Sequence, residues 1–452
     1  MHRPSPEGDR LADAVVDYAL RRVRMDPPPL DGPRTSEQLS AAAGRTITDE
    51  GIGGDEALRV FGDVLAPATI STDHPRFLAF VPAAPTESSI LGDLLVSASS
   101  IYAGSWKEGA GLVFAENEAL RFLADEFGLP ASSGGVFVSG GTAGNLSALV
   151  TARDRHRHTH PGDRGRPVIV TSAESHSSVQ AAAKVMDCDV VTAPAAADRR
   201  LTGAAVRTVL EELDDERRAQ VIAVVATAGT TNLGVIDDLA GVGAACSDHD
   251  LWFHVDGAYG GAGRLAPSAR ARYDGIELAD SIIVDPHKWL FAPFDACALL
   301  WRDPDTARRS HTQSAGYLDV LADGDPNPSD MAHHLSRRAR GVPFWFSLAV
   351  HGVNAYRAAL ETTLSTAAQV ADLVSAAPAL ELVAPPSLGV VCFRRLGWTS
   401  EQYHDWSDRL LRRGQAFVTP TSVDGETVLR LCLVNPRTTV EDCSLVLGTL
   451  SS

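Results

Sequence analysis

Lys288 is the residue whose type and setting point most directly to chemistry. The chain has 40 basic residues, and only three of them are lysines: Lys107, Lys184 and Lys288. Lys288 follows the apolar run 281–284, within the segment Asp-Pro-His-Lys-Trp at 285–289. An ε-amine forms a Schiff base with a carbonyl group, which a guanidinium cannot do. A lysine kept at the end of a buried strand therefore indicates amine chemistry; the alternative is a solvated strand-end residue.

Three other segments place distinctive groups at the ends of predicted strands. Residues 138–145, Val-Ser-Gly-Gly-Thr-Ala-Gly-Asn, run through glycines into a helix, whose free N–H groups and positive dipole end favour an anion. His176 can stack on a planar ring or exchange a proton near neutral pH. Asp256 closes an apolar run, so its carboxylate is expected to be buried and paired. Taken alone, the glycine segment also fits a tight turn, and His176 also fits a structural histidine.

Together the four pieces describe a site for pyridoxal phosphate. The lysine holds the aldehyde, the aspartate keeps the pyridine nitrogen protonated, and the glycine turn takes the phosphate. Their order and spacing favour this interpretation over four unrelated strand ends.

On these residues the chain resembles the group II pyridoxal-phosphate-dependent amino-acid decarboxylases, relatives of aromatic-L-amino-acid, histidine and glutamate decarboxylase. The similarity extends from about residue 74 to the C-terminal end. Its most specific segments are Ala-Thr-Ala-Gly-Thr-Thr at 226–231, His-Val-Asp-Gly-Ala at 254–258 and 285–289. The resemblance implies a carboxy-lyase that converts an L-amino acid to an amine and CO2. It also implies a homodimer with two sites at the interface.

The resemblance implies roles for individual residues. The expected catalytic residues are Lys288, His176 and Asp256. The residues expected around the cofactor are Gly141, Thr142, His176, Thr231, Asp256, Ala258, His287 and Lys288. Those expected to contact the substrate are Phe80, Pro82, Trp106 and Arg430. Apolar walls from Phe80 and Pro82 favour an aromatic or aliphatic amino acid over an acidic one. For Arg430, an ion pair within the C-terminal unit is an equal alternative to a contact with the substrate carboxylate.

The chain departs from the family pattern in the loop before Arg337. Relatives carry a tyrosine there as proton donor, whereas residues 322–336 contain His333 and His334 but no tyrosine, and Tyr317 lies earlier. Either a histidine delivers the proton, or the carbanionic intermediate reacts with O2 to give an aldehyde by oxidative deamination.

A second departure is Asp285, where relatives often have asparagine near the phosphate, so this carboxylate must point away or be offset. Two other interpretations are another pyridoxal-phosphate lyase of the same fold and a non-catalytic interaction protein. The context of 254–258 and 285–289 argues against the first, and the intact set of four groups argues against the second.

The elements that must position these residues alternate between helix and strand from about residue 86. Continuous apolar runs predict strands at 135–138, 167–171, 188–192, 221–227, 251–255, 281–284 and 296–301. Helices are predicted at 86–100, 108–127, 142–157, 176–186, 203–218 and 237–249. This pattern is typical of a mostly parallel sheet covered by helices, whose sites lie at the carboxyl ends of the strands. The predicted fold is α/β, that of fold type I (aspartate aminotransferase-like) pyridoxal-phosphate enzymes, with seven strands.

Three units are expected along the chain: an N-terminal helical dimerisation segment at 1–73, a cofactor-binding large domain at 74–340, and a smaller α+β domain at 341–452. The first contains predicted helices at 9–24 and 54–65. The last begins with one long helix at 341–373. It continues with strands near 389–394, 415–418 and 427–433 and helices near 400–413 and 439–450.

Composition excludes several classes of partner. A formal net charge of −17 argues against a nucleic-acid or anionic-membrane surface, since both require a basic face. No apolar signal or spanning segment follows the polar residues at the N-terminal end, and six scattered cysteines show no Cys-x-x-Cys spacing. We therefore expect a cytoplasmic protein with reduced thiols, no metal site and no membrane insertion.

Overall fold

A computed structural model describes residues 2–82, 84–162, 165–313 and 325–450 of the 452-residue chain. Its centre is a seven-stranded sheet in the order β1-β7-β6-β5-β4-β2-β3. The strands are β1 Gly134–Val138, β2 Val168–Ser172, β3 Asp189–Ala193, β4 Val221–Thr227, β5 Trp252–Asp256, β6 Ser281–Val284 and β7 Cys297–Trp301. Only the pairs that include β7 are antiparallel in this sheet. The predicted mostly parallel α/β sheet is confirmed, and each strand lies within one residue of its predicted bounds.

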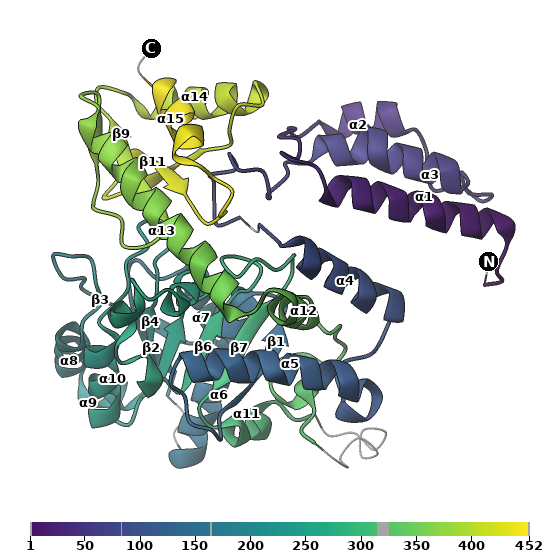
Figure 1. The fold of residues 1–452 in the computed structure, drawn as a ribbon. Coiled ribbons are helices and arrows are strands. Elements are labelled where there is room, and N and C mark those ends of the chain that lie inside the picture. Colours follow the sequence, from purple (N-terminus) through teal and green to yellow (C-terminus); the bar gives the residue numbers. More distant parts are fainter. Residues whose placement is uncertain (1, 83, 163–164, 314–324, 451–452) are drawn as a thin grey trace.

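Helices cover both faces of this sheet (Figure 1). The helices of the large unit are α4 Glu87–Ser99, α5 Trp106–Glu126, α6 Gly141–Thr159, α7 Ser177–Met186, α8 Gly203–Glu212, α9 Asp215–Ala219, α10 Leu239–Asp248 and α11 Pro304–His311. One face packs against α5, α8 and α10, and the other against α6, α7 and α11. The single helix predicted at 203–218 is wrong, because an extended Leu213 separates α8 from α9.

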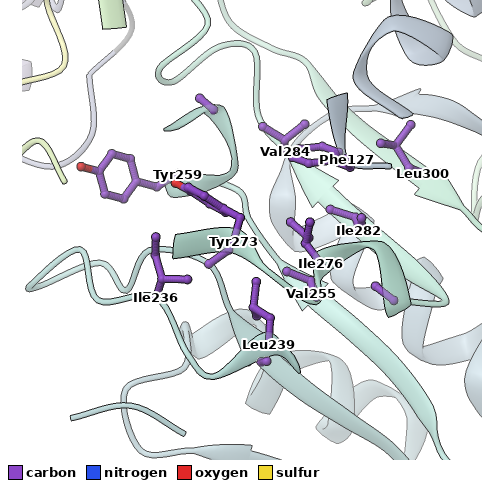
Figure 2. Packing of buried hydrophobic residues seen from close by; sticks show 14 of the residues in the cluster. Phe127, Ile236, Leu239, Val255, Tyr259, Tyr273, Ile276, Ile282, Val284 and Leu300 are labelled. Atoms are coloured by element: carbon purple, nitrogen blue, oxygen red, sulfur yellow. The ribbon is translucent and has the colours of Figure 1, made fainter. Parts of the chain in front are cut away.

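Strand side chains alternate between two hydrophobic clusters, as the pleat requires. In β6, Ile282 and Val284 belong to the cluster under α5, α8 and α10, whereas Ile283 belongs to the opposite one. Figure 2 shows the first cluster, in which Val255 and Leu300 from neighbouring strands join these two residues. Both faces of the sheet are thus covered, which explains why the strands appear in the sequence as continuous apolar runs.

The C-terminal unit contains a four-stranded antiparallel sheet in the order β10-β11-β9-β8. Its elements are α12 Val342–His351, α13 Val353–Ala376, β8 Leu380–Leu382, β9 Val390–Arg395, α14 Ser400–Arg412, β10 Thr419–Val423, β11 Glu426–Cys432 and α15 Val440–Gly448. The predicted single helix at 341–373 is wrong, because Gly352 adopts a φ of 73° and ends α12. The strand predicted at 415–418 is also misplaced: Phe417 bridges to Phe77, and β10 begins two residues later.

The N-terminal helices stand apart from both sheets (Figure 1). They are α1 Pro6–Val23, α2 Ser36–Ala43 and α3 Gly54–Val60, the last continued by a π-helical turn, Phe61–Leu65. The sequence analysis missed α2, although Thr35 and Gln38 form a capping box at its start. No residue of α1 or α2 is buried. The domain limits at residues 73 and 340 stay a prediction.

None of the helices in the described part of the chain is both long and apolar enough to cross a bilayer. All six cysteines are buried as free thiols.

Candidate active site

The residues expected around a cofactor meet in one cavity of about 250 Å³. It lies at the carboxyl ends of β4, β5 and β6 and at the N-terminal ends of α6 and α7. All eight expected residues line it, namely Gly141, Thr142, His176, Thr231, Asp256, Ala258, His287 and Lys288. A larger cavity of about 790 Å³ beside α5 and β1 contains none of them. The site is therefore assigned from its chemistry and not from cavity size.

Lys288 follows β6 and pairs with Asp285. Its Nζ lies 3.0 Å from Oδ2 of Asp285, a carboxylate that is only 1% exposed, whereas the lysine side chain is 24% exposed. Burial lowers the pKa of Lys288, but Asp285 and then Asp256 raise it by more, so its pKa lies above the ordinary value. The carboxylate of Asp285 therefore points toward Lys288 and not away, and the positive charge of the lysine offsets its negative charge.

Asp256 ends β5 on the floor of the cavity and is 5% exposed. One carboxylate oxygen accepts the backbone N–H of Ala258 at 3.1 Å, and the other accepts Nδ2 of Asn145 at 2.8 Å. These hydrogen bonds stabilise the charged form of a buried carboxylate. Ala258 is also buried, so the floor combines a charge with a small apolar surface.

The N-terminal end of α6 forms an anion cradle at one edge of the cavity. Its N-cap residue is Gly140, which has no side chain to accept the first helical N–H groups. The N–H of Gly141 lies 3.3 Å from Oδ2 of Asp285. A Cβ at Gly141 would lie 3.1 Å from Cβ of Ala258, so a side chain there would crowd the cradle.

The remaining expected cofactor residues occupy the rim. His176 is exposed and caps α7, where its Nδ1 accepts the N–H of Ser178 at 3.2 Å. Thr231 is exposed and also lines the cavity. His287 is held by its own segment, with Nδ1 2.6 Å from the carbonyl oxygen of Ala296 and Nε2 3.6 Å from Asp285.

The four residues expected to contact the substrate do not line this cavity within one chain. Phe80 is 60% exposed and has a φ of 52°, and Pro82 is buried close by. Trp106 begins α5, and its N–H donates to Oδ1 of Asn327 at 2.9 Å. Arg430 is 5% exposed and donates from Nη1 to the carbonyl oxygen of Phe80 at 2.8 Å.

Comparison with known proteins decides the family. Residues 51–396 match the family model described as the pyridoxal-dependent decarboxylase conserved domain. The chain belongs to this family. It is 31% identical over 451 residues to an aromatic-L-amino-acid decarboxylase of Bacillus atrophaeus, covering 96% of this chain and 92% of the relative. It is 33% identical to an L-2,4-diaminobutyrate decarboxylase of Rhizobium meliloti (strain 1021), covering 89% and 83%.

Two further matches bear on chemistry and fold. A 3,4-dihydroxyphenylacetaldehyde synthase of Aedes aegypti is 27% identical, covering 96% of this chain and 86% of the relative. The crystal structure of Oryza sativa TDC with PLP and tryptamine superimposes with a TM-score of 0.90, covering 100% of this chain and 98% of that one at 24% identity. The expected fold type I architecture is thus confirmed.

Membership establishes a pyridoxal-phosphate-dependent carboxy-lyase that acts on amino acids. The residues present fit this cofactor, since one cavity holds an amine, a buried carboxylate and an open helix N-terminus. Because the matched relatives are named for different amino acids, family membership does not identify the amino acid on which this chain acts.

Sequence reasoning missed several residues of the site. Asn145, Ser178, Phe294 and Asp295 also line the cavity. For Asn145 a signal existed, since it follows the glycine turn by one helical turn and so faces the same side as Gly141. Phe294 and Asp295 lie in a segment without regular structure, for which periodicity gives no direction.

Proposed function

We propose that this decarboxylase removes the α-carboxyl group of an L-amino acid to give an amine and CO2, with Lys288 as the residue that holds the cofactor. The observation that carries the proposal is the convergence of Lys288, Asp256 and the open N-terminus of α6 on one cavity. Bound pyridoxal phosphate supplies an electron sink for the pair left when CO2 departs.

Asp256 would pair with the protonated ring nitrogen of the cofactor, and its hydrogen bonds from Asn145 and Ala258 fix the position of its carboxylate. Ala258 and His176 both line the cavity, so Ala258 would pack under the ring of the bound cofactor and His176 would cover its other face. Lys288 must lose its proton before it can attack the aldehyde, and its pairing with Asp285 opposes that loss.

Gly141 and Thr142 bind the phosphate at the start of α6, where the helix dipole and N–H groups without a capping side chain from Gly140 favour an anion. Nε2 of His287 lies 3.6 Å from Oδ2 of Asp285, which places His287 at the same edge of the cavity as the proposed phosphate site. Thr231 also lines this cavity and would contact cofactor and substrate.

An aromatic or aliphatic amino acid is the proposed substrate, with Phe80, Pro82 and Trp106 forming its side-chain pocket. The name of the Bacillus atrophaeus relative supports the aromatic choice. Arg430 receives the substrate carboxylate. It is buried, and its Nε and Nη2 have no hydrogen-bond partner among the N and O atoms of the described structure. The thiol of Cys432 lies beside the guanidinium. The alternative ion pair within the C-terminal unit has no support among the salt bridges of the described residues.

A homodimer completes the proposal. Val15 and Val16 on α1 and Phe61 and Leu65 after α3 are exposed, although helices normally bury their apolar stripe. A second copy of the chain would cover these helices and bring its own residues to the site, which explains why the expected substrate residues lie apart from Lys288 in one chain.

A decarboxylation-dependent oxidative deaminase is the second candidate. His334 carries no imidazolium proton to donate at neutral pH, because burial lowers its pKa to about 4, and its Nε2–H is already given to the carbonyl oxygen of Pro328 at 3.0 Å. His333 is exposed and remains as a donor, whereas Tyr317 lies outside the described residues. The relative named as an aldehyde synthase supports this outcome for a decarboxylase scaffold.

One experiment separates these functions. The loaded enzyme is incubated with a panel of aromatic, aliphatic, basic and acidic L-amino acids, and CO2, amine, aldehyde and H2O2 are measured together. Amine equal to CO2 supports the decarboxylase, and stoichiometric aldehyde and peroxide support the deaminase. The Lys288→Ala variant should lose both activities and the visible absorption band of the bound cofactor. Failure of every amino acid in the panel to release CO2 would refute the proposal.

A further inference from the structure

A continuous chain of hydrogen bonds joins residues of the cavity lining to the protein interior. At its centre is Asn145 of α6, which is fully buried. Its Nδ2 donates to Oδ2 of Asp256 and to Oγ of Ser178, each at 2.8 Å. Its Oδ1 lies 2.8 Å from Nε2 of His254, which is also fully buried. All polar atoms of the Asn145 side chain are thus used.

The chemistry of these groups fixes the direction of the hydrogen bonds. An ionised Asp256 only accepts, so the NH2 group of Asn145 must face it and the amide oxygen must face His254. His254 therefore carries its proton on Nε2. Its Nδ1 then accepts the hydroxyl proton of Ser281, whose Oγ lies 2.8 Å away. The same Oγ accepts Nε1–H of Trp252 at 2.9 Å. Burial holds the pKa of His254 well below its ordinary value, which keeps the ring neutral, as this arrangement requires.

The second amide hydrogen of Asn145 extends the chain to the rim. Because Ser178 accepts from Asn145, its hydroxyl proton is free to go to Nδ1 of His176 at 2.8 Å. The backbone N–H of Ser178 points at the same nitrogen. The proton of a neutral His176 is therefore directed to Nε2. One amide thus reaches both the floor and the rim of the cavity.

We propose that Asn145 is a positioning residue that holds the carboxylate of Asp256 against the ring nitrogen of the cofactor and, through Ser178, holds His176, while His254 fixes which way its amide faces. This inference rests on the proposed roles of Asp256 and His176. Asn145 lines the cavity, and its role is assigned through its hydrogen bonds to Asp256 and Ser178. It aims the carboxylate of Asp256 by donating a hydrogen bond to it.

The test uses the full-length loaded enzyme with pyridoxal phosphate labelled with 15N in the ring, whose NMR shift reports whether that nitrogen is protonated. In Asn145→Asp, two carboxylates face each other and share a proton, so the charge that protonates the ring is lost. We expect the ring-nitrogen signal to move to the deprotonated position and kcat to fall about a hundredfold with KM nearly unchanged. Asn145→Leu should weaken cofactor binding about ten- to hundredfold, the effect of losing a hydrogen bond to a charged group.

Variants of the neighbouring residues separate positioning from stability. His254→Gln retains a donor for Asn145 and should keep the ring nitrogen protonated, whereas His254→Leu should not. Ser178→Ala removes the hydroxyl that joins Asn145 to His176 and leaves the hydrogen bond from Asn145 to Asp256 in place, so it should weaken cofactor binding several-fold with the ring nitrogen still protonated. Thr151→Val is the matched control, since Thr151 is fully buried on the same helix and bonded to His311. It should lower the Tm without moving the signal.

The outcomes distinguish this inference from the proposed function. A protonated ring nitrogen in the wild type that is unchanged in both Asn145 variants would overturn the positioning role and leave the decarboxylase proposal intact. An unprotonated ring nitrogen in the wild type would remove the basis for both Asp256 and Asn145. A ring-nitrogen signal that changes in the Asn145 variants of an enzyme that releases no CO2 would support the inference and refute the decarboxylase proposal.

Discussion

Replacement of Asp285 by asparagine should make Lys288 a better nucleophile toward the cofactor. The carboxylate lies 3.0 Å from Nζ and is almost completely buried, so little solvent screens the pair. Burial alone favours the neutral amine, and Asp285 is the leading influence that opposes it. Asparagine keeps the shape of the side chain and removes the charge.

The size of the effect follows from the contact. An opposite charge at this distance typically changes a protonation equilibrium about ten- to thousandfold. The fraction of neutral amine at a given pH below the pKa of Lys288 should rise in Asp285→Asn by the same factor. Removing a negative charge beside the N-terminus of α6 should also favour phosphate binding.

The assay is the rate at which the cofactor-free protein captures pyridoxal phosphate, followed by visible absorbance from pH 6 to 9. We expect the rate profile of Asp285→Asn to move to lower pH, with capture at pH 7.5 at least tenfold faster. Asp295→Asn is the control, because Asp295 also lines the cavity but pairs with Nε of Arg340 at 3.0 Å. An unshifted profile, or slower capture by Asp285→Asn at every pH, would show that the carboxylate does not restrain the lysine.

Three further predictions concern the fold. Burial lowers the pKa of His311 from 6.5 to about 4, so the unfolded chain binds more protons between these values and the free energy of unfolding falls as the pH drops from 6.5 to 4. His311→Gln should remove up to about 3 kcal/mol of that fall in urea titrations, and an equally steep fall in the variant would contradict this. Arg337→Met should cost about 3–5 kcal/mol, because Glu116 is then buried as an unpaired charge, and Glu116→Gln in the same chain should restore part of the loss. Gly144→Ala should cost about 1–3 kcal/mol by thermal unfolding, since a Cβ there would lie 2.8 Å from a β6 side chain, whereas Gly111→Ala on open helix surface should not destabilise.

The sequence predicted the large sheet well and the C-terminal unit less well. Strands buried on both faces are continuous apolar runs, and their ends carried Lys288, Asp256 and His176. The break at Gly352 was missed because the apolar periodicity continues across it, and only a positive φ separates the two helices.

The support behind the site was beyond the reach of sequence patterns. Asn145 meets Asp256 across 111 residues and His254 across 109, and nothing in local spacing predicts such pairings. The substrate contacts were not predictable for another reason, since their expected residues do not line the cavity that contains Lys288. Local chemistry at strand ends could be predicted, whereas long-range hydrogen bonding could not.

Helix α13 belongs to two cores at once. It runs from the large sheet to the small sheet (Figure 1). Tyr356 and Leu360 near its start pack into the large-sheet cluster, whereas Val370 and Val374 near its end pack into the core of the small sheet. Its 24 residues form a rod about 36 Å long. Severing the chain within this helix would therefore leave each half with an exposed apolar stripe. The two units should melt together in one calorimetric transition and resist separate expression.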